Sequence, residues 1–546
     1  MAETGRGAAG GQLAPRGAGP QAPGGGPGPD LVIERWGLPM LALVVGAFMA
    51  LLDSSIVNVA IPAMEHAFGV GTQQMEWVVT IYLLALGVVV PASGWLGDRL
   101  GFKQLYLLSL AIFTVGSGLS ALSPDLGFLI GARVLQALGG GMIMPITMSM
   151  VYRIIPRRQI GTATSFFGMA MLLAPAVGPT LGGYLVQYVT WRWIFTINLP
   201  IGVVGGLLAA ATLPDFPRHD AGRFDVAGFL TASTGLFTLL LALSEGATWG
   251  WTSHPIVWLF FVAGVAILTF VWIELTIERP LLDLRVFRYT QYTLSSLYTL
   301  GISVALFSAI FFIPVFLQLA RGMGALDTGL ILMPGALVTG MFMPVGGRLY
   351  DRFGPRFPVV LGSSILVVST FLFHNLSLTT PDTTIAIWSS LRGVGMGLAM
   401  MPATTAGMAI IPPAEVGRAS AVNNILQRLG GSFGIAFLTV ILDRGIAQQT
   451  SLAASMYSPG SAAVYGLQGV IGQLAASGMG TLDAEFAAIN HIYTVISAAS
   501  FAHTLDGMFL LLAVVGLATV IPGTMMRGKS IHEETGAVRP MGMAAD

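Results

Sequence analysis

Residues 37–62 read GLPMLALVVGAFMALLDSSIVNVAIP, and Asp53 is the one charged side chain among them. An α-helix needs about 20 apolar residues to cross roughly 30 Å of hydrocarbon, so this segment is long enough to span a membrane. Runs of this kind recur along the chain, and charged residues make up 10% of it, against about 25% in an ordinary soluble domain. The sequence therefore predicts an all-α protein that crosses a membrane many times.

We count fourteen apolar runs and predict that each crosses the bilayer. The predicted spans are residues 37–62, 77–96, 104–122, 126–151, 161–188, 192–213, 225–244, 256–276, 291–318, 327–349, 357–376, 384–410, 418–443 and 505–526.

Arginine and lysine gather in alternate connections between these runs. Arg99 and Lys103 follow the second run, and Arg153 and Arg158 follow the fourth. Cytoplasmic loops retain positive charge, so the alternation predicts that both termini are cytoplasmic and that the number of spans is even. Residues 1–36 are rich in glycine, proline and alanine, a composition typical of disorder, and we expect them and residues 527–546 to form cytoplasmic tails.

Two motifs occur twice, about 255 residues apart. GDRLGFK (97–103) returns as YDRFGPR (350–356), and IIPRRQIGTATSF (154–166) returns as IIPPAEVGRASAV (410–422). Parallel repeats of six helices around a cavity at the bilayer midplane are typical of transporters. We therefore expect one six-helix bundle over 37–213, another over 291–526, and two inserted transmembrane helices within 214–290.

The longest connection, residues 444–504, is predicted to be an extracellular loop. Near its end Phe486, Ile489, Tyr493 and Ile496 have helical apolar spacing. Such spacing favours a helix along the outer membrane surface, and a packed extracellular cap would explain it equally well.

The composition excludes several classes of function. The chain has no cysteine, which excludes disulfides, thiol nucleophiles and thiolate metal sites. Its 26 basic and 26 acidic residues balance, so no nucleic-acid partner is expected. GTMMRGKS (523–530) fits the phosphate-loop pattern, but that loop works between a strand and a helix of a nucleotide-binding domain. We expect no metal, no cofactor and no ATP, and an ion gradient as the energy source.

Asp53 is the first candidate for chemistry, because a carboxylate at membrane depth is costly and is usually functional. It lies nine residues before the outer end of the first run, and Arg133 lies seven residues after the outer start of the fourth. At about 1.5 Å per residue both lie roughly 10–14 Å below the outer surface. A closed Asp–Arg pair favours the charged carboxylate, and separation favours protonation. This predicts a proton-coupling switch, although a static pair joining two helices would fit the same pattern.

GWLGDRLGFK (94–103) is predicted to be a cytoplasmic loop that acts as a conformational latch. Gly94 and Gly101 permit close backbone approach, Asp98 can bind a helix N-terminus, and Arg99 and Lys103 hold the loop inside. A stable turn with charges that only set the topology is the alternative.

LLAPAVGPTLGGYL (172–185) contains the pairs Gly178–Pro179 and Gly182–Gly183. Proline removes a backbone hydrogen bond and kinks a helix, and glycine lets another helix approach closely. The segment predicts a hinge or a sealed helix contact, and a plain packing kink fits as well.

These motifs together resemble the major facilitator superfamily, in particular its drug:proton antiporters with fourteen transmembrane helices. GWLGDRLGFK is similar to the superfamily's loop signature, RVLQALGGG (133–141) to its fourth-span signature, and residues 174–183 to the antiporter signature of the fifth span. LDSSIVNVAIP and WRWIFTINLPIG (191–202) resemble the fourteen-helix branch. The resemblance covers roughly 37–526 and implies efflux driven by inward proton flow, with Asp53 and Arg133 at the coupling site.

The second half departs from the family pattern. The extra acidic residues that the family uses for cationic substrates have no clear match in spans nine to twelve. The chain instead offers a set of polar residues, Arg392, Asn423, Asn424, Gln427 and Arg428. We interpret them as a wall of the substrate cavity suited to neutral or anionic amphiphiles, and hydrogen bonds between helices are the alternative.

The sequence as a whole predicts a monomeric bacterial transporter of the cytoplasmic membrane that is not an enzyme. It would export lipophilic drugs or related small molecules by alternating access, in exchange for protons. A transporter, importing or exporting, of one specific metabolite is the alternative. An enzyme would need a reactive constellation, and the sequence contains neither H-E-x-x-H nor G-x-S-x-G.

Overall fold

The computed structural model describes residues 33, 35–216, 218, 222–278, 280–412, 415–456, 468–469, 471–473, 476 and 480–526, and these residues form helices and connections without a strand. The first half contains α1 (Gly37–Phe68), α2 (Thr72–Met75), α3 (Trp77–Val89), α4 (Ala92–Leu100), α5 (Phe102–Ala121), α6 (Leu126–Ile154), η1 (Arg157–Gln159), α7 (Ile160–Tyr188), α8 (Trp193–Thr196) and α9 (Asn198–Thr212). The rest contains α10 (Val226–Trp249), α11 (His254–Thr276), η2 (Leu284–Arg288), α12 (Thr290–Val315), η3 (Phe316–Ala320), α13 (Ala325–Phe353), α14 (Arg356–Leu372), η4 (Phe373–Asn375), α15 (Asp382–Met408), α16 (Val416–Met456) and α18 (Thr481–Met525).

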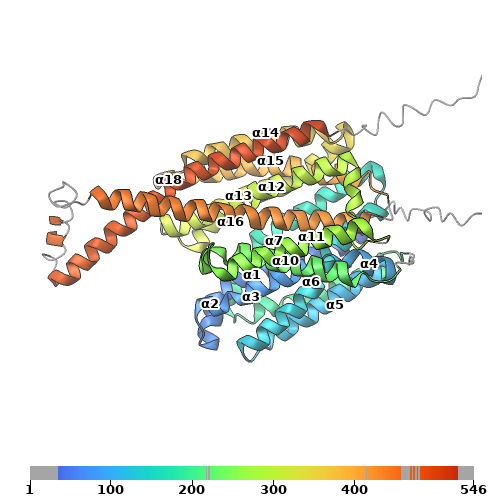
Figure 1. Ribbon diagram of the computed structural model, residues 1–546, viewed down its shortest axis with the longest axis horizontal. Helices are drawn as coiled ribbons and strands as arrows, with labels where there is room; N and C mark the ends of the chain where they lie inside the picture. The colour runs from blue at the N-terminus through green and yellow to red at the C-terminus, as the bar shows by residue number, and fades with distance from the viewer. Residues whose placement is uncertain are drawn as a thin grey trace, which may run out of the picture. The chain divides into compact units, whose positions relative to one another are not determined.

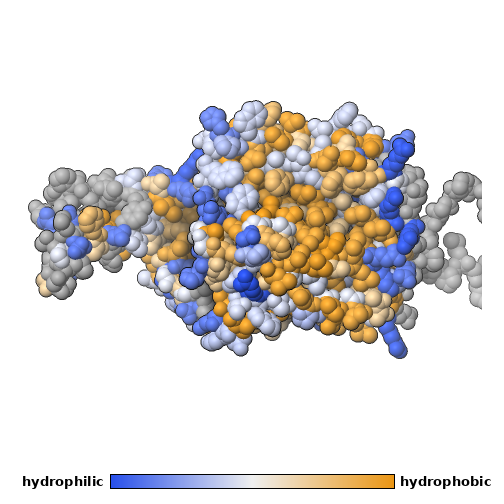
Figure 2. Space-filling model, turned by 90° about the horizontal axis from the view of Figure 1, so that it is seen from below, coloured by the Kyte–Doolittle hydropathy of each residue, from blue (hydrophilic) through white to orange (hydrophobic). Residues whose placement is uncertain are grey.

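Among the described residues, twelve helices are long and apolar enough to cross a membrane, or thirteen if the bent pair α3–α4 counts as one span. Each of the fourteen predicted runs overlaps a helix. The run 384–410 corresponds to α15, whose hydropathy is lowered by Arg392 and by several glycine, serine and threonine residues. Figure 2 shows a broad apolar surface between hydrophilic ends. An all-α multi-pass membrane fold is thus confirmed, and the count of fourteen stays a prediction.

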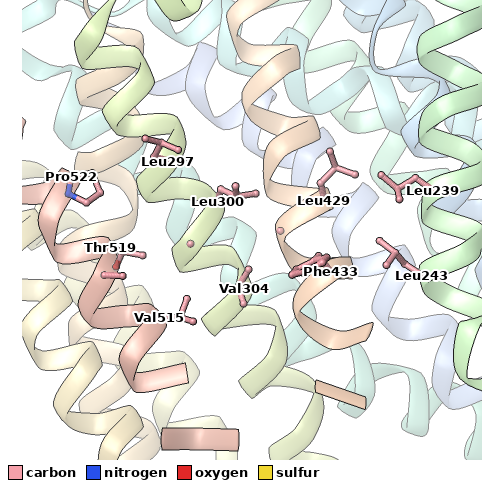
Figure 3. Close-up of a pocket in the computed structure, with 13 residues that line it drawn as sticks. Leu239, Leu243, Leu297, Leu300, Val304, Leu429, Phe433, Val515, Thr519 and Pro522 are labelled. Atoms are coloured by element: carbon pink, nitrogen blue, oxygen red, sulfur yellow. The ribbon is translucent and has the colours of Figure 1, made fainter. Parts of the chain in front are cut away.

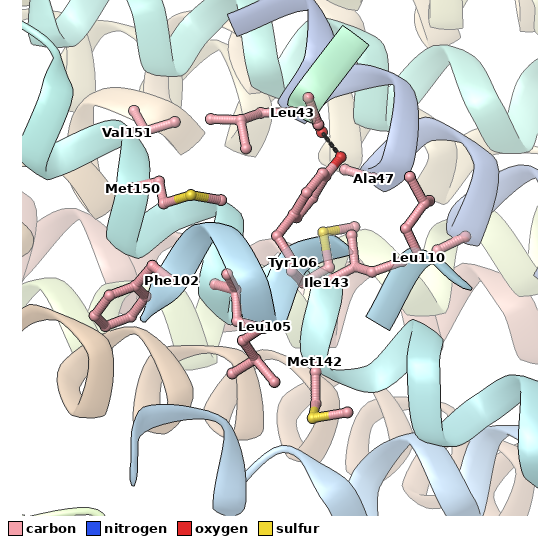
Figure 4. Close-up of a cluster of buried hydrophobic side chains, with 14 of the residues drawn as sticks. Leu43, Ala47, Phe102, Leu105, Tyr106, Leu110, Met142, Ile143, Met150 and Val151 are labelled. Atoms are coloured by element: carbon pink, nitrogen blue, oxygen red, sulfur yellow. Dashed lines mark hydrogen bonds between the residues drawn. The ribbon is translucent and has the colours of Figure 1, made fainter. Parts of the chain in front are cut away.

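The helices form two bundles with an inserted pair beside their seam. In Figure 1 α1 to α6, in blue to cyan, lie on one side and the helices of 291–526 lie mostly on the other, with α7 between them in contact with both α1 and α13. The core of the first bundle joins α1, α5 and α6, and there the hydroxyl of Tyr106 donates to the carbonyl of Ala42 at 2.8 Å (Figure 4). The inserted helix α10 packs against both α3 and α16, so it contacts both bundles.

Both ends of the membrane-embedded chain lie at one end of the bundles, on the right in Figure 1. Ile33 donates its backbone N–H to Ile154 at the end of α6, and Trp36 donates its indole N–H to Gln159. The predicted disorder of 1–36 is therefore wrong for these last residues, because they are tied to α6 and η1. We call this side, which carries Arg153 and Arg418, the arginine-rich end.

The predicted loop 94–103 is mostly helical. α3 and α4 meet at a bend of 58°, and α4 continues to Leu100. Pro91 interrupts the hydrogen bonds of α3 but suits the start of the next helix. Gly101, with φ +91°, ends α4 and starts α5. The segment predicted to be a latch is therefore a short helix followed by a one-residue turn.

The predicted extracellular loop 444–504 is helical at both of its ends, within α16 as far as Met456 and within α18 from Thr481, where helical spacing was noted in the sequence. α16 has 41 residues and α18 has 45, so at about 1.5 Å per residue each is about twice as long as the hydrocarbon core. Their ends project beyond the other helices in Figure 1. Phe486 and Ile489 lie in this part of α18 with 73% and 48% exposure, so they do not pack as a cap against the described helices.

Candidate functional site

Asp53 and Arg133 form a fully buried ion pair in the first bundle. Asp53 lies in α1 and Arg133 in α6, and both are 0% exposed. Arg133 Nη1 donates to Asp53 Oδ2 at 2.6 Å. The structure therefore places together two residues that the sequence predicted to lie at one depth. A charge held without water is costly unless it is paired and hydrogen-bonded, and this pair meets both conditions.

Gln136 and Asn198 also bind Asp53, and the sequence analysis missed both. Gln136 Nε2 and Asn198 Nδ2 each donate to Asp53 Oδ1 at 2.9 Å. Gln136 also accepts from Arg133 at 2.8 Å, and Asn198 also donates to Ser117 Oγ at 3.0 Å. Gln136 follows Arg133 by three residues, which places both on one helix face and is a signal that could have been used. No local signal in the sequence connects Asn198, at the start of α9, to α1.

Two further contacts fix the position of the Arg133 guanidinium. Its Nε donates to the carbonyl of Val78 at 3.3 Å, and its Cζ lies 3.8 Å from the ring centroid of Tyr82. Its Nη2 is buried and has no hydrogen-bond partner among the described residues. The carboxylate of Asp53 thus accepts three donors, from Arg133, Gln136 and Asn198. Because these donors lie on α6 and α9, the carboxylate joins α1 to both helices.

The predicted latch joins the two bundles at the arginine-rich end. Asp98 Oδ1 lies 3.9 Å from Arg153 Nη2, and Asp98 Oδ2 lies 3.9 Å from Arg418 Nη2 on α16. A Cβ on Gly94 would lie 3.2 Å from Cγ of Arg418, so this glycine permits the approach of α16. Two other residues of the predicted latch, Arg99 and Lys103, do not reach the second bundle in the contacts described. Arg99 lies over the ring of Trp95, and Lys103 Nζ lies 3.4 Å from Oδ1 of Asp215 in the connection after α9.

Asp351, in the second copy of the repeated motif, binds the first bundle in return. Its carboxylate accepts the backbone N–H groups of Gly161 and Thr162 at 3.0 Å and the hydroxyl of Thr162 at 2.7 Å. These donors form the first turn of α7, where backbone N–H groups lack helical partners and favour a negative charge. A Cβ on Gly161 would lie 2.7 Å from the carbonyl of Gly347, so α7 and α13 touch backbone to backbone. The aspartate of the repeated motif in each half therefore contacts the other half, Asp98 at Arg418 and Asp351 at the start of α7.

The glycine-rich segment of α7 forms a close contact with α1. A Cβ on Gly178 would collide with the side chain of Ser55, and one on Gly182 would lie 2.8 Å from Cγ1 and 3.0 Å from the carbonyl oxygen of Ile56. Gly183 has more room, because its Cβ would lie 4.0 Å from the nearest atom. α7 stays helical through Pro179. The arrangement matches a sealed helix contact, and it lies within three residues of Asp53 on α1.

A small cavity with both polar and apolar lining residues lies between the two bundles. Its volume is about 30 Å³, roughly enough for one water molecule. Asn423, Asn424 and Gln427 of the predicted wall line it, and the other lining residues are Met144, Met148, Phe167, Met171, Met400, Met401, Thr404 and Ser420. Five methionines make its apolar side deformable, since the unbranched thioether chain adapts to irregular shapes.

The two predicted arginines of the wall differ in position. Arg428 Nε donates to Asn424 Oδ1 at 3.0 Å, so it orients a lining side chain. Arg392 does not line this cavity. Its Cζ lies 5.9 Å from the ring centroid of Phe373, and its Nη1 is buried without a hydrogen-bond partner among the described residues.

No group of three or more histidine, aspartate or glutamate residues in the described part of the chain is arranged to hold a metal ion. The phosphate-loop match ends in residues 527–530, which lie outside the described residues.

Comparison with known proteins identifies the architecture. The family model described as Major Facilitator Superfamily matches residues 43–435. The chain is 35% identical over 402 residues to an uncharacterized MFS-type transporter, YhcA, of Bacillus subtilis (strain 168), covering 74% of this chain and 76% of that protein. It is 31% identical to the lincomycin resistance protein LmrB of Listeria monocytogenes, with 75% and 87% covered. It is 32% identical to a multidrug resistance protein B homolog of Mycobacterium tuberculosis, with 73% and 75% covered.

Solved structures show the same fold at low sequence identity. The human organic anion transporter MFSD10 superposes with a TM-score of 0.56 at 14% identity, over 88% of this chain and 99% of that one. The proton:xylose symporter XylE superposes with a TM-score of 0.55 at 12% identity, over 88% and 95%.

Proposed function

Because the chain belongs to the major facilitator superfamily and is a multi-pass protein of a bacterial cell membrane, we propose that it exports lipophilic drugs or related small molecules in exchange for protons. Membership of this family and its fold indicate transport rather than catalysis. Relatives with about three-quarters of the chain in common are named for lincomycin and multidrug resistance, which supports export of drug-like molecules.

The observation that carries the proton part of the proposal is the Asp53 network. A carboxylate that is 0% exposed and accepts from Arg133, Gln136 and Asn198 is stable in its charged form only while these donors stay in place. Movement of α6 or α9 away from α1 would favour proton uptake, and their return would favour release. Proton binding would thus be linked to the positions of helices in one bundle, as antiport requires.

The substrate part rests on the cavity between the bundles. In the structure it has room for about one water molecule, so a substrate would enter only after the bundles separate. The contacts of Asp98 and Asp351 join the bundles at the arginine-rich end, where they would release and form again in each cycle. Neutral amides and flexible methionines favour amphiphiles without positive charge. No cofactor is required, and a monomer suffices because the described network and the cavity lie within one chain.

One proton that moves through 100 mV releases about 2.3 kcal/mol. By the rule that 1.4 kcal/mol is tenfold, this supports an accumulation of roughly fortyfold. An ion gradient is therefore a sufficient energy source for export.

The test uses inverted membrane vesicles with an acid interior and a proton-sensitive dye. Cationic, neutral and anionic lipophiles are added in turn, and we expect neutral or anionic compounds to dissipate the gradient. Asp53→Asn should abolish this response, whereas Asp327→Asn, which removes an exposed aspartate at the start of α13, should keep it. Full proton-driven transport by Asp53→Asn would refute the role of Asp53.

A further inference from the structure

An apolar groove of about 570 Å³ lies on the far side of α16 from the cavity between the bundles. Figure 3 shows its walls, with Leu239 and Leu243 on α10, Val304 on α12, Phe433 on α16 and Val515 on α18. The groove therefore lies where the inserted helix α10 meets the second bundle. It is separate from the Asp53 network and from the cavity between the bundles.

The floor of the groove is closed by tight helix contacts at two glycines. A Cβ on Gly301 of α12 would collide with the side chain of Thr519 on α18, and one on Gly430 of α16 would lie 2.8 Å from the carbonyl of Leu300. α12 is thus held against both α16 and α18. α10 packs against α16 and contributes Leu239 and Leu243 to the opposite wall of the groove.

The lining offers very little to a polar ligand. The lining residues carry no charge, and their one side-chain hydroxyl, that of Thr519, donates its proton to the carbonyl of Gly516 in its own helix at 2.6 Å. A headgroup, a sugar or an ion would leave most of its polar groups without a partner here, which is costly. The ligand must therefore be hydrocarbon.

The groove also lies at hydrocarbon depth. Leu300 and Val304 follow the start of α12 by ten and fourteen residues, which places them about 15–21 Å from that end of the helix. Thr519 precedes the end of α18 by six residues, or about 9 Å. Both helix ends are at the arginine-rich end, so the groove extends from there toward the bilayer midplane.

We propose that the groove binds an acyl chain of a membrane lipid from the leaflet on the arginine-rich side. Its rim is continuous with the bilayer-facing surface, since the lining residues Leu297 and Phe433 are each more than half exposed. A lipid chain thus needs no new opening to enter. Because α10 packs against α3 as well as α16, a chain in this groove would hold the inserted pair against the second bundle without contact with the substrate cavity.

The test is photolabelling in nanodiscs of phosphatidylethanolamine and phosphatidylglycerol that contain a lipid with a diazirine in mid-chain. Mass spectrometry then locates the labelled peptides. We expect the groove segments around Val304 and Phe433 to be labelled about tenfold more, per exposed residue, than the bilayer face of α11 around Leu268. Val304→Trp should fill the groove and reduce its labelling, and Leu268→Trp on the α11 face is the matched control.

Leu243→Phe provides a milder filling variant if Val304→Trp does not fold. Labelling of the groove equal to that of α11, or unchanged by filling, would overturn the proposal. Because the chain has no cysteine, Leu243→Cys also tests for a second copy, and efficient disulfide dimers through this position would overturn it too. Displacement of the label by transported compounds would identify a substrate site in place of a lipid site.

Discussion

Removal of one member of the Asp53–Arg133 pair should destabilise the protein far more than removal of both. The two side chains are 0% exposed and their charged atoms lie 2.6 Å apart. Loss of one partner leaves an uncompensated buried charge, which costs about 3–5 kcal/mol, whereas apolar replacement of a whole buried pair is often neutral. We therefore expect Asp53→Asn and Arg133→Met each to lower the free energy of unfolding by about 3–5 kcal/mol. The double variant leaves no buried charge at this pair but keeps a polar Asn at position 53, so it should regain part of that loss.

The measurement is a double-mutant cycle of unfolding in mixed micelles titrated with dodecyl sulfate. The cycle cancels the contacts of Arg133 with Val78 and Tyr82, which are lost whether or not Asp53 is present. Asp327→Asn serves again as the control for loss of an exposed carboxylate. Single variants that cost less than about 1 kcal/mol and add within about 0.5 kcal/mol would refute a coupled, desolvated pair.

The same variants separate stability from transport. If the double variant folds well, its failure to transport cannot be attributed to unfolding. At 100 mV we expect the proton-driven accumulation ratio to fall from roughly fortyfold to about one. Retention of the full ratio would show that the pair is only structural.

Three further predictions concern the other contacts of the site. Gly182→Ala should cost about 1–3 kcal/mol in thermal or detergent unfolding because its Cβ would press on α1, while Gly183→Ala should be tolerated, and equal effects would contradict the packing described. Asp351→Ala removes a helix cap worth about 0.5–2 kcal/mol. Spin-label distances between α7 and α13 at the arginine-rich end should therefore show the fraction of separated molecules raised by about twofold to thirtyfold. An unchanged distance distribution would show that the Asp351 contact does not hold the bundles together. Asn424→Leu deprives Arg428 of its acceptor and should raise KM for neutral and anionic substrates by about tenfold, whereas an equal rise for cationic lipophiles would refute the selectivity assigned to this wall.

The transmembrane class and the pairing of Asp53 with Arg133 could be predicted because hydropathy places residues along the bilayer normal. Each apolar run has two ends near the membrane surfaces, so counting from those ends gives the depth of a charged residue. The same reasoning failed beyond the bilayer. α16 continues as a helix to Met456, through residues predicted to form a loop, because a helix outside the bilayer needs no continuous apolar run. In α18 the helical spacing of Phe486 and Ile489 did indicate a helix, but not that it continues into the last span.

The partners of the predicted residues required the tertiary structure. Gln136 shares a helix face with Arg133, but Asn198 reaches Asp53 from α9, and nothing local to either residue indicates that α9 lies beside α1. The sequence likewise showed that YDRFGPR repeats GDRLGFK. Only the packing of α13 on α7 revealed that Asp351 binds the other half, as Asp98 does through Arg418.

Hydropathy alone was enough to predict that the chain spans a membrane many times and that Asp53 and Arg133 lie at a similar depth. The folded structure was needed to show which helices are neighbours, and with them the three donors of Asp53, the contacts of Asp98 and Asp351 between the bundles and the two faces of α16. The reason is physical. The transfer of apolar residues from water to hydrocarbon determines which segments lie in the bilayer, so hydropathy predicts depth. Lipid is as apolar as leucine, so hydropathy does not determine which helices pack side by side.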